Sequence, residues 1–484
     1  MAYIRKVKTA SGATAVQVVV KTYGRITKLT HIGSAHTLAQ LNALMVLAKK
    51  RLHQNQPELF PKLRNESVSI RLKESSSRLL WQILLDQYQE LGFNQLNDEV
   101  FASLVAARLV EPTSKLDSLR VMQDLGVPPM AKNRLYRCLA RVAGGNYRET
   151  ISQACFKQTA KKDLALVLYD VTTLYFEIQR EDDYRRPGLS KERRLEPQIV
   201  IGLLVNRQGF PLGLSSFTGN TAETKTILPM IAEFQRHYGL RRITVVADAA
   251  MMNKTNLKAL AATGYTYVVG SRLSKIPYNL AEYQNQGRAE LADGQILVEK
   301  REDYRIIYQY REKRAVLDRN NIAKQLEKAK RIVSGQAPVH RAKFVSFGGW
   351  VKRLNQGLIY KAYALAGIKG YVTNLDIPDE QVIGYYHQLF RVEASFRMAK
   401  SDLKARPVFH RKRDSIEAHL TVVLAALAVG KTIEAKTGLS IKQFVKTLRP
   451  IRSGVITVNG QDCPIEAKIP EEIKPLIHRL SLGH

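Results

Sequence analysis

The chain has 484 residues, of which 45% are apolar; this excludes a disordered protein and allows a large core with more than one domain. Lysine and arginine total 75 against 43 aspartate and glutamate residues, and the resulting formal charge of +32 indicates a polyanionic partner such as nucleic acid. Cys138, Cys155 and Cys463 form no C-x-x-C pair, so neither a disulfide framework nor a zinc ribbon is expected.

The sequence contains no pattern that predicts export or a membrane span. The first residues, MAYIRKVKTASG, lack the apolar segment of a signal peptide. The longest late apolar run, residues 421–430, is too short to cross a bilayer. We therefore expect a cytoplasmic protein with no membrane partner.

Residues 1–160 are expected to form an N-terminal region that binds DNA. Residues 14–30 predict a β-hairpin around Tyr23–Gly24, and helical patterns follow. Residues 115–142 predict a helix, a short turn that contains two prolines, and a second helix rich in arginine. This resembles helix-turn-helix geometry, in which the second helix enters a major groove. An ordinary helical hairpin with a solvated basic face is the alternative.

From about residue 163 the pattern changes to buried strands that alternate with helices. Strands are predicted over residues 164–177, 199–206, 210–219, 243–250, 265–270 and 368–375. Three helices are predicted: one over about 222–238, one that ends near Ala262 between the fourth and fifth strands, and one over about 380–404. This alternation favours an α/β fold with layers of helix and sheet.

The same pattern suggests a domain organisation. We expect a core built from residues 163–272 and 366–430. Residues 273–365 contain short strands rich in lysine and arginine, with a polar helix near 317–333, and are expected to be a β-rich insertion. Residues 431–484 form a C-terminal region that could serve dimerisation.

Three carboxylates are candidates for chemistry. Asp170 lies inside the apolar strand LALVLYDVTTLYFE, Asp248 closes the apolar strand ITVVA, and Glu393 lies on a predicted helix. Two such strands side by side would bring both aspartates to one sheet edge, where ligands bind in α/β sheets. Like charges that close require a cation, and oxygen ligands suit Mg²⁺. With the glutamate they would form a two-metal site for phosphodiester displacement.

Each carboxylate also has a purely structural explanation. A single aspartate in a strand is often hydrogen-bonded at the strand end. A glutamate on a helix is usually a solvated side chain.

The helix around Glu393 has an unusual face. Tyr386, Glu393 and Lys400 are separated by seven residues each, and seven residues turn an α-helix by about 700°. An uninterrupted helix would therefore present a phenol, a carboxylate and an ammonium group in one column about 21 Å long. Such a column suits a helix that lies along a phosphate backbone.

The order Asp170, Asp248, Glu393 resembles the DDE transposases of bacterial insertion sequences. The likeness is closest to the branch that has a β-rich insertion and the signature Y-x₂-R-x₃-E-x₆-K. Tyr386, Glu393 and Lys400 match it within YHQLFRVEASFRMAK, whereas Leu389 stands at the position of its arginine. The segments LYDVTTLYFE, FTGNTAETKTILP and VVADAAMMNKTNL also resemble that branch, and the likeness covers roughly residues 163–430.

This resemblance implies an RNase H-like fold, a mixed sheet flanked by helices with Asp170 on the first strand and Asp248 on the fourth. It implies two Mg²⁺ ions per active site, held by both aspartates and Glu393, with Mn²⁺ as a substitute. It also implies binding to terminal inverted repeats, cleavage at the element ends, and attack of the 3′-OH on target DNA. The partners would be double-stranded DNA and a second copy of the chain, in the cytoplasm and associated with the bacterial nucleoid.

Basic side chains complete the predicted DNA interface. With Tyr386 and Lys400, the candidate DNA contacts are Arg134, Arg137, Lys191, Arg193, Arg194, Arg391, Arg397, His410 and Arg411. Each of these could instead be a solvated charge. Two other functions stay open: a non-catalytic DNA-binding protein descended from a transposase, and another RNase H-like nuclease.

Overall fold

The computed structural model describes most of the chain. The described residues are 2–53, 70–160, 166–177, 180–188, 196–238, 243–251, 253–271, 273, 276–277, 291–338, 342–348, 351–406, 408, 410–458 and 461–481. They divide into two compact units. The smaller unit is Met1–Arg71 with Thr457–Gln461, and the larger is Leu72–Ile456 with Asp462–His484.

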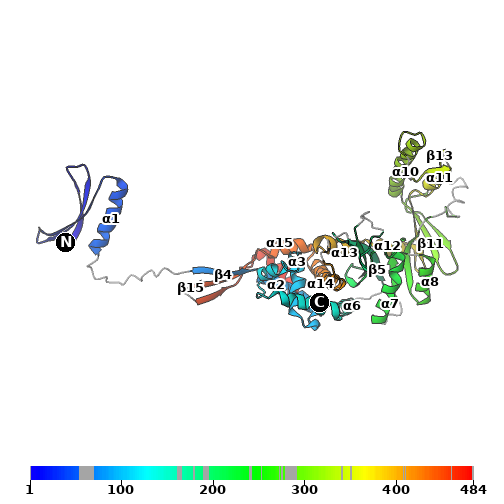
Figure 1. Ribbon diagram of the computed structural model, residues 1–484, viewed down its shortest axis with the longest axis horizontal. Coiled ribbons are helices and arrows are strands. Elements are labelled where there is room, and N and C mark those ends of the chain that lie inside the picture. Colours follow the sequence, from blue (N-terminus) through cyan, green and yellow to red (C-terminus); the bar gives the residue numbers. More distant parts are fainter. Residues whose placement is uncertain are drawn as a thin grey trace. The chain divides into compact units, whose positions relative to one another are not determined.

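The smaller unit is a three-stranded antiparallel sheet with one helix. Its elements are β1 (Ala2–Lys8), β2 (Thr14–Thr22), β3 (Arg25–Ala35) and α1 (Leu38–His53) (Figure 1). Tyr23 and Gly24 join β2 to β3 with φ angles of 48° and 80°. Two consecutive positive φ angles are typical of the type I′ turn, whose twist matches that of the paired strands. The predicted hairpin is therefore confirmed.

The larger unit is built on an eight-stranded mixed sheet. Its order is β10-β11-β14-β9-β8-β5-β6-β7. The strands are β5 (Leu166–Tyr175), β6 (Gln198–Asn206), β7 (Pro211–Thr218), β8 (Thr244–Ala247), β9 (Thr266–Ser271), β10 (Ile296–Lys300), β11 (Arg305–Tyr310) and β14 (Ile368–Thr373). β5, β6 and β7 are antiparallel, β8 and β9 run parallel to β5, and the remaining pairs are antiparallel. The α/β fold expected from the sequence is confirmed.

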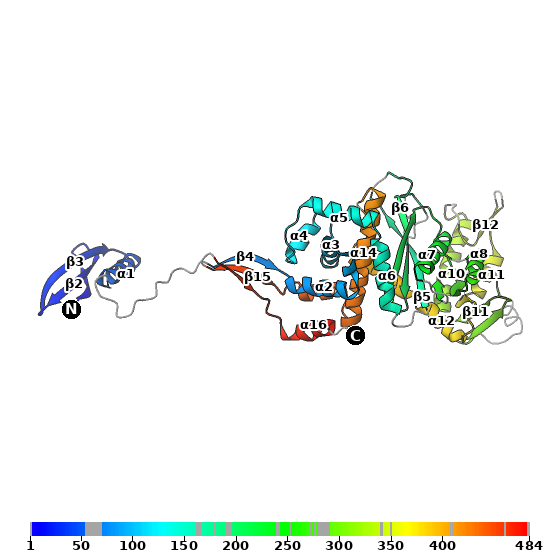
Figure 2. The ribbon, with the colours of Figure 1, turned by 90° about the horizontal axis from the view of Figure 1, so that it is seen from below.

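Helices cover both faces of this sheet (Figure 2). Alternate residues of β5 point to opposite sides, so Leu166 and Leu168 join one apolar cluster while Val167 and Tyr169 join the other. The first face packs against α12 (Asp379–His387), α13 (Phe390–Arg397) and α14 (Arg413–Thr437). The second face packs against α7 (Ile227–Tyr238) and α8 (Lys254–Ala262).

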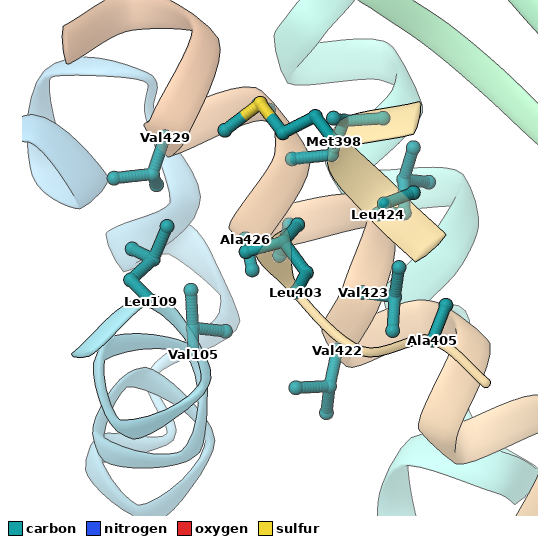
Figure 3. Packing of buried hydrophobic residues seen from close by; sticks show 14 of the residues in the cluster. Val105, Leu109, Met398, Leu403, Ala405, Val422, Val423, Leu424, Ala426 and Val429 are labelled. Atoms are coloured by element: carbon teal, nitrogen blue, oxygen red, sulfur yellow. The ribbon is translucent and has the colours of Figure 1, made fainter. Parts of the chain in front are cut away.

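A helical layer surrounds α14. It contains α2 (Arg78–Glu90), α3 (Glu99–Val110), α4 (Ser118–Asp124), α5 (Lys132–Gly144), α6 (Tyr147–Ala160), α15 (Ile441–Leu448) and α16 (Lys474–Ser481). Figure 3 shows Met398, Leu403 and Ala405 packed among side chains of α3 and α14, namely Val105, Leu109, Val422, Val423, Leu424, Ala426 and Val429. α14 is long and apolar enough to cross a membrane, but 83% of its most apolar 18-residue window is buried inside the protein. It therefore serves here as the central helix of the core.

Residues 273–365 contain short strands and a helix that covers the expected residues 317–333. Among the described residues, β10 and β11 extend the central sheet, and the rest forms α10 (Glu312–Val333), the hairpin of β12 (Val345–Gly348) and β13 (Val351–Leu354), and α11 (Gln356–Ala364). The 22-residue α10 is the longest of these elements. Side chains of opposite charge alternate along α10, which favours an exposed helix.

The structure also contains a second three-stranded sheet and several short helical turns. A small sheet has the order β16 (Gln461–Ile465), β15 (Ser453–Val458) and β4 (Ile70–Ser76). The remaining helical turns are η1 (Phe93–Leu96), η2 (Glu223–Lys225), η3 (Met398–Asp402) and η4 (Glu471–Ile473).

Candidate active site

Strand register brings Asp170 and Asp248 together. β5 and β8 pair in parallel up to Tyr169 and Ala247, so the next residue on each strand is one of the two aspartates. Adjacent strands lie about 4.8 Å apart. Leu168 and Val246, two residues earlier, both belong to the apolar cluster under α12 and α13. Both carboxylates therefore start from neighbouring positions on the same face of the sheet.

Local hydrogen bonds orient each carboxylate. Asp170 is 9% exposed, and one of its oxygens accepts a hydrogen bond of 2.8 Å from the N–H of Val171. Asp248 is half-buried and accepts a bond of 2.7 Å from the N–H of Ala249. Backbone donors of this kind stabilise the charged form of a buried carboxylate.

The helix that carries Glu393 is not continuous, and this corrects the predicted column of Tyr386, Glu393 and Lys400. α12 ends at His387, α13 begins at Phe390, and the turn between them has hydrogen bonds to the third preceding residue. After Arg397 the chain continues as the π-helical turn η3. Each change of helical pitch rotates the side chains that follow. Burial of the apolar residues on both sides of the break decides this geometry, since local propensity alone would continue the helix.

Tyr386 connects α12 directly to Asp248. Its phenol donates a hydrogen bond of 2.9 Å to Asp248 Oδ1, and its side chain is only 6% exposed. The phenol lies over Gly270 of β9, where an added Cβ would come within 2.7 Å of the tyrosine oxygen. Burial raises the pKa of Tyr386 far above its usual range, and the negative charge of Asp248 adds to that rise. The phenol therefore stays protonated and acts as a hydrogen-bond donor.

Lys369 is a basic residue of the site that the sequence analysis did not single out. Its ammonium lies 4.3 Å from the centroid of the Tyr386 ring, within the range of a cation–π interaction. Burial lowers the pKa of Lys369, and so does the charge of Arg314, whereas the carboxylates of Asp248 and Glu393 act in the opposite direction. Both acidic side chains therefore influence one ammonium group. The strand signal IKGYVTNL revealed β14, but not which of its residues faces the site.

Lys400 reaches the site from the other side. Its ammonium donates a hydrogen bond to the hydroxyl of Thr172, which follows Asp170 by two residues on β5 and so lies on the same face. Leu389, at the position of the signature arginine, is 7% exposed and packs in the core. Arg391 is exposed, with its guanidinium 4.9 Å from the Phe390 ring. Among the described residues, Arg391 forms no ion pair with the three carboxylates.

The donor set fits a hard divalent cation in chemistry. Carboxylate oxygens are the ligands that Mg²⁺ and Mn²⁺ take in proteins, and Asp170, Asp248 and Glu393 offer nothing else. Among the described residues, no three histidine, cysteine, aspartate or glutamate side chains are gathered closely enough to hold a metal ion. Glu393 is exposed on α13 and has freedom to change rotamer. The three side chains therefore have the ligand chemistry that the ion requires, and both aspartates start on the sheet face that α13 covers.

A family model described as the transposase DDE domain matches residues 161–429, which is more than half of the chain. The chain belongs to the DDE transposases. The match confirms the resemblance drawn from the three acidic residues, and domains of this family use divalent metal ions. None of the curated proteins matches the chain.

A solved structure with some similarity to this transposase is the cryo-EM structure of the piggyBac transposase synaptic complex with hairpin DNA. The two chains share 11% sequence identity and a TM-score of 0.37, and the match covers 77% of this chain and 70% of that chain. The family assignment rests on the sequence match.

The other predicted DNA contacts of the transposase fall into three groups. Arg134 and Arg137 are exposed on α5, and Arg397 and Arg411 are also exposed. His410 is half-buried, and its ring centroid lies 5.4 Å from that of His419. Lys191, Arg193 and Arg194 lie outside the described residues.

The predicted helix-turn-helix segment contains α4, a turn and α5. Leu135, Cys138, Leu139 and Val142 of α5 are buried in the helical layer. The opposite side of α5 is basic and exposed. This arrangement is compatible with a DNA-binding helix-turn-helix and with an ordinary helical hairpin that has a solvated basic face.

Proposed function

We propose that this transposase mobilises a bacterial insertion sequence: it binds the terminal inverted repeats, cleaves DNA at the element ends and joins the 3′-OH to target DNA. The supporting observation is the register of β5 and β8, after which Asp170 and Asp248 occupy neighbouring positions beneath the helix of Glu393. Three carboxylates on one face of a mixed sheet are suited to metal-dependent phosphoryl transfer.

The strand order supports an RNase H-like core. Counted along the chain, the five strands from β5 to β9 have the order 3-2-1-4-5. The first three are antiparallel, and the last two run parallel to the first. Asp170 is then on strand one and Asp248 directly follows strand four, as the resemblance implied.

The roles of the residues follow from their contacts. Asp170, Asp248 and Glu393 would hold two Mg²⁺ ions, with Mn²⁺ as a substitute. When bound, such ions activate water or a 3′-OH and stabilise the leaving oxygen in phosphodiester displacement. Tyr386 keeps Asp248 oriented through its hydrogen bond. Lys369 and Lys400 place positive charge on two sides of the carboxylates, where a phosphate group would enter.

The assembly belongs to the same proposal. Two element ends must be held together, so we place the chain as a homodimer in the synaptic complex, in the cytoplasm near the bacterial nucleoid. The charge of +32 supports binding to several DNA segments at once, with an affinity that falls steeply as salt rises.

The test compares cleavage with binding. Asp170→Asn, Asp248→Asn and Glu393→Gln are incubated with DNA that carries an inverted-repeat end, in Mg²⁺, next to the wild-type protein. We expect each variant to lose cleavage while its affinity for the end stays near that of the wild type. A variant that cleaves at the normal rate would remove its residue from the site. Wild-type protein that binds but never nicks would support the non-catalytic alternative, and nicking of any duplex would support a general nuclease.

A further inference from the structure

A large cationic cavity lies in the helical layer. One of its lining residues, Lys404, follows Lys400 of the candidate active site by four residues. Its volume is about 1140 Å³. Its walls come from the end of α3, the segment after it, α5, the first turns of α14, and Lys404, Arg406, His410 and Lys412. The residues that line it with basic side chains include Arg108, Lys115, Lys404, His410, Lys412 and His419. Of the described lining residues only Asp414 is acidic, and it is exposed.

Two cations lie at the base of this cavity without an acidic partner among the described residues. Arg108 is 6% exposed, and its guanidinium donates a hydrogen bond of 3.5 Å to the carbonyl oxygen of Leu403. Lys115 is 7% exposed, and its ammonium lies 3.4 Å from His419 Nδ1. Burying a charge that has no counter-ion is unfavourable, and proteins normally pair such groups. The pair therefore has the character of a site that an anion completes.

The groups around this pair respond to its positive charge. Burial lowers the pKa of Arg108 to about 10 and that of Lys115 well below its usual value, the latter also because Arg108 is near. Burial together with Lys115 and Arg108 lowers the pKa of His410 to about 4 and strongly lowers that of His419. A bound anion would offset the repulsion between these positive groups and favour their charged forms.

An exposed lysine, Lys404, adds positive charge at the rim of the cavity. Lys404 is exposed and has a φ of 43°, an uncommon conformation for a residue with a side chain. Strained backbone of this kind is found at ligand sites. Figure 3 shows the neighbouring Leu403 and Ala405 packed against α14, so the segment is held in place on both sides of Lys404.

We propose that this cationic cavity binds a phosphate group of the DNA backbone, with Arg108 and Lys115 at its base and Lys404 at its rim. The inference rests on the proposed function for the identity of the anion. The segment that lines the cavity at Lys404 is the continuation of α13 and η3, which carry Glu393 and Lys400. α5 forms another wall through Tyr136, Leu139 and Ala140, and the same helix carries the exposed Arg134 and Arg137. One strand can therefore contact the cavity and its basic surroundings together.

The first experiment measures thermal unfolding of the full-length protein in inorganic phosphate and in chloride of equal ionic strength. We expect a saturable rise in the Tm of the wild type with phosphate. Lys115→Met keeps the length of the side chain and removes its charge, so its Tm without phosphate should rise and its response to phosphate should vanish. Lys431→Met is the control, because Lys431 is a half-buried lysine that pairs with Glu434. A Lys115→Met variant that keeps the full phosphate response overturns the inference.

The second experiment measures the affinity for duplex DNA as a function of salt. Lys115→Met and Lys404→Ala should each weaken binding several-fold and reduce the slope of log affinity against log salt by about 0.9. Because Lys404 is exposed, its variant reports on the site even if a change at the base disturbs folding. An unchanged slope together with a phosphate effect on Tm would assign the cavity to a free anion and overturn the DNA assignment.

These results are separable from the proposed function. If the wild type binds DNA without cutting it while Lys115→Met shows a salt slope reduced by about 0.9, the cavity inference stands and the cleavage proposal fails. If the wild type cuts element ends and Lys115→Met binds with normal affinity and slope, only the cavity inference fails.

Discussion

The phenol of Tyr386 donates a hydrogen bond of 2.9 Å to Asp248, across 138 residues of sequence. Through this bond α12 holds a carboxylate that projects from the end of β8. The ring also supports Lys369, whose ammonium lies 4.3 Å from its centroid. A single buried tyrosine thus links an acidic and a basic group of the candidate site, which makes it a useful position to test.

Tyr386→Phe should slow cleavage by about tenfold while DNA affinity stays unchanged. The substitution keeps the packed ring and removes one hydrogen bond to a charged group, which contributes about 1.5–3 kcal/mol. Cleavage of an end duplex at saturating DNA, together with fluorescence anisotropy for binding, provides the measurement. Cleavage at the wild-type rate would show that the bond has no part in orienting Asp248.

Gly270→Ala should produce a similar loss through a different route. The new methyl group would stand within 2.7 Å of the Tyr386 oxygen and 3.2 Å of Ala249, so the phenol must move away from Asp248. Gly213→Ala in β7 is the matched control, since its Cβ would meet only Met230 at an ordinary 3.6 Å. We expect the control to cleave normally. Equal effects of the two alanines would indicate a general disturbance of the sheet.

Lys369→Met should slow cleavage by about tenfold or more and should lower the Mg²⁺ concentration needed for half-maximal rate. The ammonium is suited to stabilise an entering phosphate, yet it repels a divalent ion near Asp248 and Glu393. Lys369→Arg should restore much of the rate. Lys258→Met, an exposed lysine on the opposite face, is the control. A magnesium titration that does not shift would argue against the electrostatic role.

Lys400→Met should impair cleavage, or processing of a hairpin end, more than retention of DNA. Its ammonium is anchored on the hydroxyl of Thr172, close to Asp170 on β5. Thr172→Val removes only that anchor, so we expect it to slow cleavage by about threefold, in line with one neutral hydrogen bond. If Lys400→Met reduces binding and cleavage equally, the residue contributes only an attractive charge.

Stability should fall in acid through Glu417. Burial alone would raise the pKa of this half-buried carboxyl, but Arg148 and the hydroxyls of Tyr184 and Ser216 lower it on balance below 4.5. A carboxyl with a lowered pKa in the folded state contributes stability above its unfolded value, and that contribution is lost as pH falls through the folded value.

Glu417→Gln should therefore lower the free energy of unfolding by about 1–3 kcal/mol at pH 7 and by much less at pH 3. Urea unfolding at both pH values measures the difference. Glu434→Gln is the control on the same helix, because among the described residues the Glu434 carboxylate forms a single ion pair, with Lys431, and its side chain is 26% exposed. An effect of Glu417→Gln that is equal at both pH values would show that its charge is unimportant.

The sequence by itself determined the elements and the family. Apolar runs bounded by turn residues specified β5, β6 and β7, and Gly24 marked the turn of the hairpin at Tyr23–Gly24. The acidic residues carried the resemblance to DDE transposases. These features are local, or they depend on the order of residues along the chain. They can be recognised without knowing which segments meet.

Tertiary structure decided how those residues face one another. The break between α12 and α13, the pitch of η3 and the contact of Tyr386 with Asp248 arise because distant apolar side chains compete for one core. The same competition places Lys369 at the candidate site and buries Arg108 beside Lys115. Helical periodicity alone predicts a straight column of side chains. Packing against a twisted sheet outweighs it, since burial of several apolar residues exceeds the small cost of an irregular turn.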